Sequence, residues 1–409
     1  MIADADPRRW RMLGILSLAE LLGMSLWFGA SAVSSQLGAN WSLTPAETGW
    51  LTTIVQLGFV AGTALSAMLN LADIIVSRRL FAVSALAGAV VNGMIVVAPG
   101  YAAVLVLRFL TGFCLAGVYP PAMKMIATWF KSQRGLAIGT IVAALTIGKA
   151  TPYLVHAVPD IGVATVILTA STGAALAAII VATGFSDGPF AFESRPFDWG
   201  LAASVIRDRQ WRLATGGYLG HMFELYAFWT WIPAFLAASV AASRAGTSPG
   251  LVSLIAFGTI AVGGAGCIWG GLVADRSGRE RLVTIALAAS GTCSLVVGFT
   301  YGASMWIVAP ITLVWGFFVV ADSAQFSALV TESVPSYAVG TALTVQTSLG
   351  FLLTMATIQG IPLLAARMGW QWSFAVLSLG PVFGIAAIRQ LAKVRSMRLA
   401  EPPTAVPAG

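Results

Sequence analysis

The sequence predicts an all-α membrane protein whose twelve transmembrane helices form two pseudo-symmetric six-helix bundles. Its 409 residues are 58% hydrophobic and only 10% charged, with a mean hydropathy of +0.85, whereas a soluble domain carries about 25% charged residues. Long uncharged stretches recur, for example at 48–72 and 282–321, and about 20 apolar residues cross a hydrocarbon core of about 30 Å. An internal repeat indicates the two bundles.

Turn signals such as those at 98–101 and 300–302 divide the apolar stretches into twelve spans. In chain order, their centres lie near residues 25, 58, 88, 112, 145, 172, 224, 260, 290, 314, 350 and 379. Twelve spans place both ends of the chain on one side of the membrane.

Basic residues gather in the termini and in the loops on that side. Under this assignment they number 18, against two, Arg244 and Arg367, in the loops of the opposite side. The 18 are Arg8, Arg9, Arg11, Arg78, Arg79, Lys131, Arg134, Arg195, Arg207, Arg209, Arg212, Arg276, Arg279, Arg281, Arg389, Lys393, Arg395 and Arg398. The positive-inside rule therefore predicts a multi-pass protein of the bacterial inner membrane with both termini cytoplasmic.

This topology explains the net charge of +7 without a nucleic-acid partner. The first residues, MIADADPRRWRM, carry both charge signs and no small-residue cleavage site follows, so we expect a mature cytoplasmic end and not a signal peptide. Cys114, Cys267 and Cys293 lie in apolar stretches without pairing spacing. We expect neither a disulfide, a metal site nor a cofactor.

Two landmarks repeat along the chain. Glu20, followed by Trp27, recurs as Glu224 followed by Trp231, a shift of 204, and the Leu-Ala-Asp after span two recurs as Val-Ala-Asp after span eight, a shift of 202. Such a parallel duplication is used by secondary transporters. We expect an N-terminal bundle at 1–190, a linker at 191–210, a C-terminal bundle at 211–392 and a cytoplasmic tail at 393–409.

The loop after span eight, GLVADRSGR at 271–279, closely resembles the signature loop of the major facilitator superfamily. The first-half copy at 70–79 keeps Asp73 and the final arginines but lacks the leading glycine. Arg108 with Gly112 and Gly117 resembles the fourth-helix motif of that superfamily. The resemblance implies two bundles that rock around a central cavity lined by helices 1, 4, 7 and 10.

Within this resemblance, the segment at 107–130 is similar to the branch that carries nitrate, nitrite and small organic anions. Members of that branch place arginines in helices 2 and 8. The segments 48–72 and 245–274 contain none, which argues against nitrate itself.

Charges near the ends of the spans are candidate gates. Acidic and basic side chains there can form ion pairs in one state and break them in the other, although the arginines also serve as topology anchors. The candidates are Asp73, Asp275, Arg276, Arg279 and Asp322. Asp322 is equally consistent with a solvated helix end.

Two glutamates lie near the middle of the bilayer in matching positions of the halves. Counted from Arg11 and Arg212 at about 1.5 Å per residue, Glu20 lies roughly 14 Å deep and Glu224 roughly 18 Å deep. A charged carboxylate is costly there, so each can take up and release a proton as a cavity opens to either side, or can bond two helices while protonated. We expect proton coupling, with His221, one turn from Glu224, as a relay or as a packing partner.

Two cations inside the spans are candidate substrate ligands. Lys149 lies about 22 Å from Arg134 along its helix, too far from a boundary to snorkel easily. It can bind an anionic substrate or neutralise a glutamate. Arg108 can hold a carboxylate, polarise the cavity or brace backbone carbonyls.

Aromatic side chains supply a surface for a flat substrate. Trp27, Tyr226, Trp231 and Tyr153 are the candidates for lining the cavity, and Trp and Tyr also anchor helices at membrane interfaces.

The sequence therefore predicts a proton-coupled secondary transporter that moves a small organic, anionic solute by alternating access and works as a monomer. The alternative is a proton-driven efflux antiporter for drugs or metabolites, against which the cationic Lys149 counts. An intramembrane enzyme or receptor is disfavoured, because the spans hold no paired Asp motif, no His-rich metal site and no Ser with a base.

Overall fold

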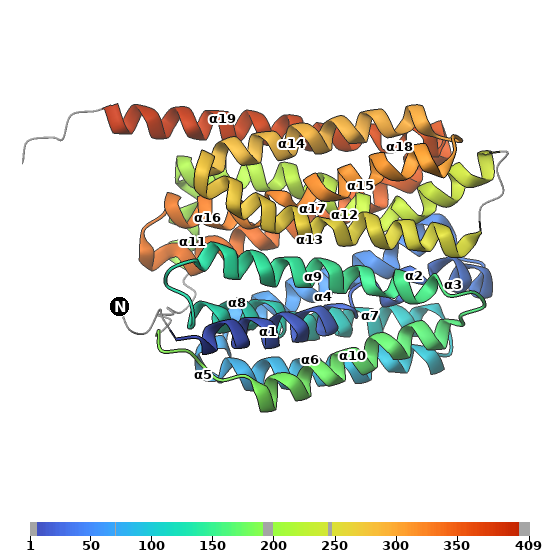
Figure 1. Cartoon of the computed structure of the whole chain (residues 1–409), viewed down its shortest axis with the longest axis horizontal. Helices are drawn as coiled ribbons and strands as arrows, with labels where there is room; N and C mark the ends of the chain where they lie inside the picture. Colours follow the sequence, from blue (N-terminus) through green and yellow to red (C-terminus); the bar gives the residue numbers. More distant parts are fainter. Residues whose placement is uncertain (1–5, 70, 191–198, 244–247, 401–409) are drawn as a thin grey trace, which may run out of the picture.

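The computed structural model describes residues 6–69, 71–190, 199–243 and 248–400, except for the side chains of Ala72, Asp73, Trp199, Ser336 and residues 398–400. The helices lie roughly parallel to one another and pack in front of and behind each other (Figure 1). The first half comprises α1 (Arg8–Met24), α2 (Gly29–Ala32), α3 (Ser34–Trp41), α4 (Pro45–Met68), α5 (Leu71–Ile74), α6 (Ser77–Gly93), η2 (Met94–Val97), α7 (Tyr101–Leu115), α8 (Tyr119–Ala127), α9 (Arg134–His156) and α10 (Val163–Gly184). After α11 (Trp199–Arg207), the second half comprises α12 (Arg209–Ala242), α13 (Pro249–Ser277), α14 (Arg279–Val296), η3 (Val297–Thr300), α15 (Met305–Ala321), α16 (Ser323–Ser333), η4 (Ser336–Ala338), α17 (Val339–Met368), α18 (Trp370–Ser373), η5 (Ala375–Ser378) and α19 (Leu379–Ala400).

Among the described residues, eleven helical segments are long and apolar enough to cross a membrane. They correspond to the second through twelfth spans expected from the sequence. The first span is broken: α1 has 17 residues and ends at Met24, and a turn at 25–28 separates it from the four-residue α2. A uniform hydropathy profile cannot reveal this break, because the residues of the turn are as apolar as those around it.

The helices form two bundles, which we call the N bundle (α1–α10) and the C bundle (α12–α19) (Figure 1). Helices α9 and α4 of the N bundle contact α13 and α17 of the C bundle, respectively. The expected linker at 191–210 contains α11, and α19 runs to Ala400, past the boundary placed at residue 392. All-α architecture with two six-span halves is therefore confirmed.

Close helix crossings repeat in both bundles and support the duplication. A Cβ atom on Gly58 of α4 would lie 2.0 Å from the Phe109 carbonyl oxygen of α7, and one on Gly266 of α13 would lie 2.1 Å from the Phe317 carbonyl oxygen of α15. The two glycines are 208 positions apart, close to the shifts of the sequence repeat. Only glycine lets the backbones approach so closely, as in other membrane helix pairs.

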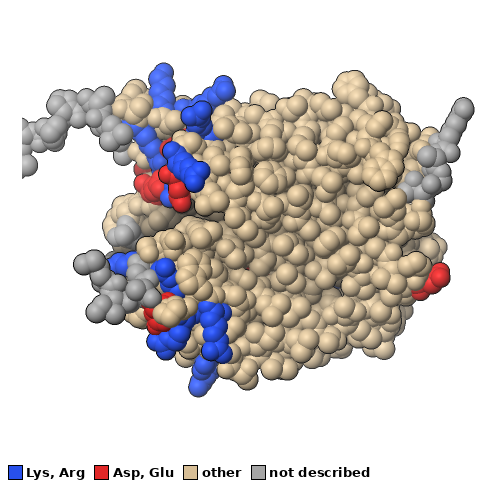
Figure 2. All heavy atoms as spheres, viewed as in Figure 1, with Lys and Arg blue, Asp and Glu red and all other residues tan. Residues whose placement is uncertain are grey.

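Lys and Arg side chains gather at one end of the molecule, on the left in Figure 2. We call this the basic end; α1, α9, α12 and α14 each begin there with an arginine. The orientation of this end in the membrane stays a prediction.

The end opposite the basic end is closed by hydrogen bonds between the bundles. The Thr53 hydroxyl of α4 lies 3.0 Å from the Gln359 amide of α17, and His156 Nδ1 of α9 lies 2.8 Å from Ser253 Oγ of α13. Closer to the centre, the Thr354 hydroxyl donates to the Gln56 side-chain oxygen. These contacts tie the bundles together at that end.

Candidate functional site

Lys149 of α9 lies in the interface between the bundles, where its side chain reaches Tyr226 of α12. Its side chain is only 2% exposed. The Nζ atom donates a hydrogen bond of 2.6 Å to the Tyr226 hydroxyl and lies 4.0 Å from the centroid of the Trp27 ring and 5.5 Å from that of Trp229. A desolvated ammonium above aromatic rings gains about 2 kcal/mol or more per good contact. We call Lys149, Trp27, Tyr226 and Trp229 the lysine cage.

Both bundles build the lysine cage. Lys149 and Trp27 come from α9 and from the turn after α1, whereas Tyr226 and Trp229 come from α12. Tyr226 and Trp229 are three positions apart and therefore share one face of the helix. Phe351 of α17 packs against both Trp27 and Tyr226, with ring centroids 5.8 and 5.2 Å apart. A molecule bound at Lys149 would thus contact both halves of the protein.

Hydrogen-bond donors around the lysine cage lack acceptors. The indole nitrogens of Trp27 and Trp229 and the Tyr153 hydroxyl are buried and have no hydrogen-bond partner among the described residues. Phe28 links the last two, with its ring centroid 6.1 Å from that of Tyr153 and 6.3 Å from that of Trp229. Each unsatisfied buried donor costs about 1–3 kcal/mol. A ligand rich in acceptor atoms would relieve this cost.

Glu20 lies close to the lysine cage without joining it. Its side chain is fully buried, and neither carboxylate oxygen has a hydrogen-bond partner among the described residues. Lys149 and Tyr119 are close enough to interact electrostatically with Glu20, although no direct ion pair forms in the described part of the chain. A buried carboxyl group without hydrogen bonds is costly as an anion, so Glu20 is chemically suited to hold a proton. Its role in proton coupling stays a prediction.

Glu224 occupies different surroundings from Glu20. Ser290 Oγ donates to its Oε2 atom and Trp315 Nε1 donates to its Oε1 atom, both at 2.7 Å. These partners belong to α14 and α15, so the carboxylate lies inside the C bundle. The expectation that the two glutamates flank a central cavity alike therefore fails for Glu224, because its helix turns Tyr226 and Trp229 toward the N bundle.

His221 pairs with Asp322 one turn before Glu224. The imidazole Nδ1 atom lies 2.9 Å from Asp322 Oδ1, and Nε2 lies 2.9 Å from Ser323 Oγ. Asp322 is 1% exposed and stands at the junction of α15 and α16. The reading of Asp322 as a solvated helix end is therefore wrong.

Arg108 braces the break in the first span. Its guanidinium donates to the carbonyl oxygens of Leu26 (2.9 Å), Trp27 and Leu51 (3.2 Å), and it lies 3.4 Å from Asn92 Oδ1. The first two carbonyls belong to the turn that interrupts the helix. Of the roles expected for Arg108, these bonds favour bracing, and a direct substrate contact stays a prediction.

Trp231 lies apart from the lysine cage, toward the closed end. Its indole nitrogen donates to the Ile358 carbonyl at 2.8 Å, and its ring centroid lies 5.8 Å from that of Trp370. Its match with Trp27 in the sequence repeat does not extend to its surroundings, because the first span unwinds after Met24 whereas α12 continues.

Of the candidate gates at the basic end, Arg279 forms hydrogen bonds within the C bundle. Arg279 donates to Glu332 Oε1 at 2.8 Å and to the Gln325 side-chain oxygen at 2.7 Å. Asp275 is exposed and lies instead near the start of α9, with Oδ2 3.8 Å from the position of a Cβ atom on Gly135. A latch between Asp275 and Arg279 is therefore not formed in this state. Arg276 is exposed, and the side chain of Asp73 lies outside the described residues.

The cavity-lining candidates chosen from the sequence did not include Trp229 or Phe351. The spacing of Trp229 from Tyr226 could have identified it, since both fall on one helical face. Nothing local marks Phe351, which reaches the site only through the packing of α17 on α4.

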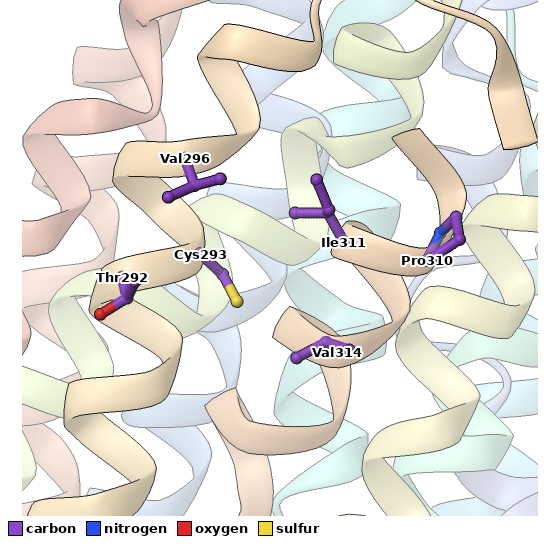
Figure 3. A pocket seen from close by; sticks show the side chains of 6 residues that line it. All are labelled: Thr292, Cys293, Val296, Pro310, Ile311 and Val314. Carbon is purple, nitrogen blue, oxygen red and sulfur yellow. The ribbon is translucent and has the colours of Figure 1, made fainter. Parts of the chain in front are cut away.

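An apolar groove lies elsewhere, between α14 and α15. Figure 3 shows Cys293 and Val296 of α14 facing Ile311 and Val314 of α15 across it. No charged residue lines it, so it is a poor candidate for an anion site.

Known proteins resemble this chain at three levels. The family model of the Major Facilitator Superfamily matches residues 15–358. A protein of Bacillus subtilis (strain 168), provisionally named a niacin/nicotinamide transporter (NiaP), is 27% identical over 183 residues, which cover 44% of this chain and 45% of that protein. The niacin transporter NiaP of Acinetobacter baylyi (strain ATCC 33305 / BD413 / ADP1) is 32% identical over 133 residues, or 30% of this chain and 29% of that protein. Both matches thus span less than half of the relatives' lengths.

The overall fold has a close structural counterpart. The crystal structure of a bacterial homologue of the human lysosomal transporter Spinster, inward-facing and unoccupied, superposes with a TM-score of 0.70 at 15% identity, covering 98% of this chain and 100% of that one. At this identity the likeness concerns the fold alone. Because the family model spans most of the chain and the fold agrees with it, this chain belongs to the major facilitator superfamily, a family of secondary transporters and not of enzymes.

Proposed function

We propose that this protein is a proton-coupled transporter that carries a small, flat organic anion, with an aromatic monocarboxylate such as nicotinate as the first candidate. The observation that carries the proposal is the lysine cage: a buried cation among aromatic rings, shared by the two bundles and bordered by donors without acceptors. A carboxylate would bond Lys149, and a flat ring would stack on the indoles. The names of the two relatives both include niacin, an aromatic monocarboxylate, and one of them also includes the neutral nicotinamide.

The position of the cage supports alternating access. Its members come from both bundles, so a bound anion would be released as the bundles separate at either end. We propose that the basic end faces the cytoplasm of a bacterium, that the bundles at 1–190 and 211–392 move as units around the linker, and that a monomer suffices for transport. Glu20, buried without a hydrogen bond beside Lys149, is the proposed proton carrier of the N bundle.

The test is uptake of radiolabelled nicotinate into proteoliposomes under an imposed pH gradient, with neutral nicotinamide as the matched competitor. We expect nicotinate to accumulate and nicotinamide to compete poorly. Lys149→Gln should lower the uptake rate at low nicotinate concentration by roughly 10- to 150-fold, because a hydrogen bond to a charged group contributes about 1.5–3 kcal/mol.

Tyr226→Phe is the control, because it removes the hydroxyl that bonds Lys149 but keeps both the cation and the ring. It should retain preference for the carboxylate. Equal competition by nicotinamide and nicotinate in the wild type would refute the anionic substrate, and full activity of Lys149→Gln would refute the site.

A further inference from the structure

A second cluster of titratable side chains lies inside the C bundle, separate from the lysine cage. His221 of α12 and Asp322 of the α15–α16 junction approach to 2.9 Å, with side chains 2% and 1% exposed. Ser323 Oγ lies 2.9 Å from the other imidazole nitrogen, so both ring nitrogens are engaged. Phe326 packs on the imidazole, with centroids 5.2 Å apart.

The bonding of Asp322 leaves room for a proton. Although Oδ1 lies at ion-pair distance from the imidazole, neither carboxylate oxygen accepts a well-aligned hydrogen bond from a described residue. A buried anion with so little compensation is strongly unfavourable. With one shared proton the His221–Asp322 pair is neutral, and without it the pair carries a single buried negative charge.

The titratable and charged side chains near this pair come from several helices. Glu224 of α12 and Cys267 of α13 are the groups whose electrostatic interaction with Asp322 can be described. Glu224 is already bonded by Ser290 and Trp315. In α16, which begins directly after Asp322, the side-chain oxygen of Gln325 accepts a hydrogen bond from Arg279. Arg279 also donates to Glu332 at the basic end. Tyr218 stacks beside His221, with centroids 6.3 Å apart.

Two neighbours of the pair are partly exposed. Ser323 and Tyr218 are only partly buried, unlike His221 and Asp322. His221 lies 12 residues from the start of α12 at Arg209, or roughly 18 Å at 1.5 Å per residue. The interruption of the tenth span falls at Asp322 itself, so separation of α15 from α16 would admit water beside the carboxylate.

We propose that His221 and Asp322 are a proton-binding pair of the C bundle that takes up and releases one proton in the transport cycle, with Ser323 connecting the imidazole to water. The proton moves between water and the shared pair, and no other bond changes. This inference rests on the proposed proton coupling, and it assigns the C-bundle proton to this pair in place of Glu224, which is held by two hydrogen bonds.

The first test does not depend on the substrate. The chain has two histidines, so His156→Asn leaves His221 as the sole signal from isotope-labelled histidine in solid-state NMR of proteoliposomes. We expect this signal to titrate. Asp322→Asn should alter the pH dependence of this signal, because it removes the carboxylate that lies 2.9 Å from the imidazole, and the matched control Glu224→Gln should alter it less.

If the His221 signal does not change across the accessible pH range while Asp322 is intact, the proposal is overturned. This measurement needs no substitution of Asp322. An unchanged pH dependence in a folded Asp322→Asn protein would overturn the proposal equally.

The second test separates the pair from the proposed function. Uptake driven by a pH gradient is compared with nicotinate exchange at equal pH. Asp322→Asn and His221→Asn should lower gradient-driven accumulation by at least about tenfold, which corresponds to 1.4 kcal/mol, while exchange stays within about twofold of the wild type. Ser323→Ala should slow accumulation without abolishing it.

If the wild type accumulates nicotinate and both variants do so equally well, the pair is refuted while the proposed function stands. If the wild type exchanges nicotinate but does not respond to the gradient, proton coupling fails and the pair fails with it. If the wild type does not transport nicotinate, the proposed substrate fails, and the NMR titration still decides the pair.

Discussion

Replacement of Arg108 by methionine should destabilise the N bundle and not merely weaken substrate binding. The guanidinium satisfies the buried carbonyls of Leu26, Trp27 and Leu51 at the break in the first span. Methionine has a similar length but donates no hydrogen bond. The Trp27 carbonyl would lose its donor, whereas the Leu26 carbonyl still accepts from the Gly29 amide at 3.3 Å and the Leu51 carbonyl belongs to the continuous helix α4. One buried acceptor left without a donor costs about 1–3 kcal/mol.

The assay is thermal unfolding of the detergent-purified protein with a thiol-reactive dye. The three cysteines are free and lie within the spans, where unfolding exposes them. At roughly 2–4 °C per kcal/mol for a domain of this size, the lower limit predicts a Tm at least about 2 °C below that of the wild type. Arg108→Lys, which keeps the charge but not the fork of donors, should fall between the two.

Two results would refute this reasoning. A folded Arg108→Met protein that melts within about 2 °C of the wild type would show that the bonds are not needed for stability. A normal Tm with a greatly raised KM for substrate would assign Arg108 to the ligand instead of to the broken helix.

Further predictions concern the two glutamates and one close crossing of helices. Glu20→Gln should reduce the dependence of uptake on the pH gradient while sparing exchange, because an amide imitates a permanently protonated carboxyl group; unchanged dependence in proteoliposomes would contradict the role of Glu20. Glu224→Gln should instead lower thermal stability by about 1–3 kcal/mol, since one of its two donors loses its acceptor, and a stable protein with lost coupling would reverse this assignment. Gly58→Val should prevent folding, because its Cβ would lie 2.0 Å from the Phe109 carbonyl oxygen, whereas Gly340→Val, with open space around it, should express normally; equal yields in membrane fractions would contradict the need for this close approach.

Hydropathy and charge were sufficient to predict the spans and the two bundles, because the membrane forces a backbone to satisfy its hydrogen bonds within helices. The same signals could not predict the break after Met24. Its stabilising partner, Arg108, lies more than 80 positions away from Leu26 and Trp27, whose carbonyls it binds in the turn, and no local pattern of residues reports that contact.

The candidate site was predicted in part for a similar reason. The sequence identified Lys149 as a cation inside a span and Tyr226 as an aromatic lining residue, but the hydrogen bond between them joins different bundles. Glu20 and Glu224 look equivalent in the repeat, yet Trp315 and Ser290 hold only the second. The rotation of each helix about its axis depends on such distant partners, so sequence spacing alone gives the depth of a residue and not the direction it faces.

The bond between Lys149 and Tyr226 has a consequence for affinity. In this structure the tyrosine hydroxyl occupies the position on the ammonium that the proposed carboxylate would take, so it would compete with that substrate from the opposite bundle. Every 1.4 kcal/mol in that internal bond weakens the apparent affinity of the anion about tenfold. A moderate affinity suits a transporter. Tyr226 can displace the proposed substrate from Lys149 again, and the substrate can then leave on the other side of the membrane.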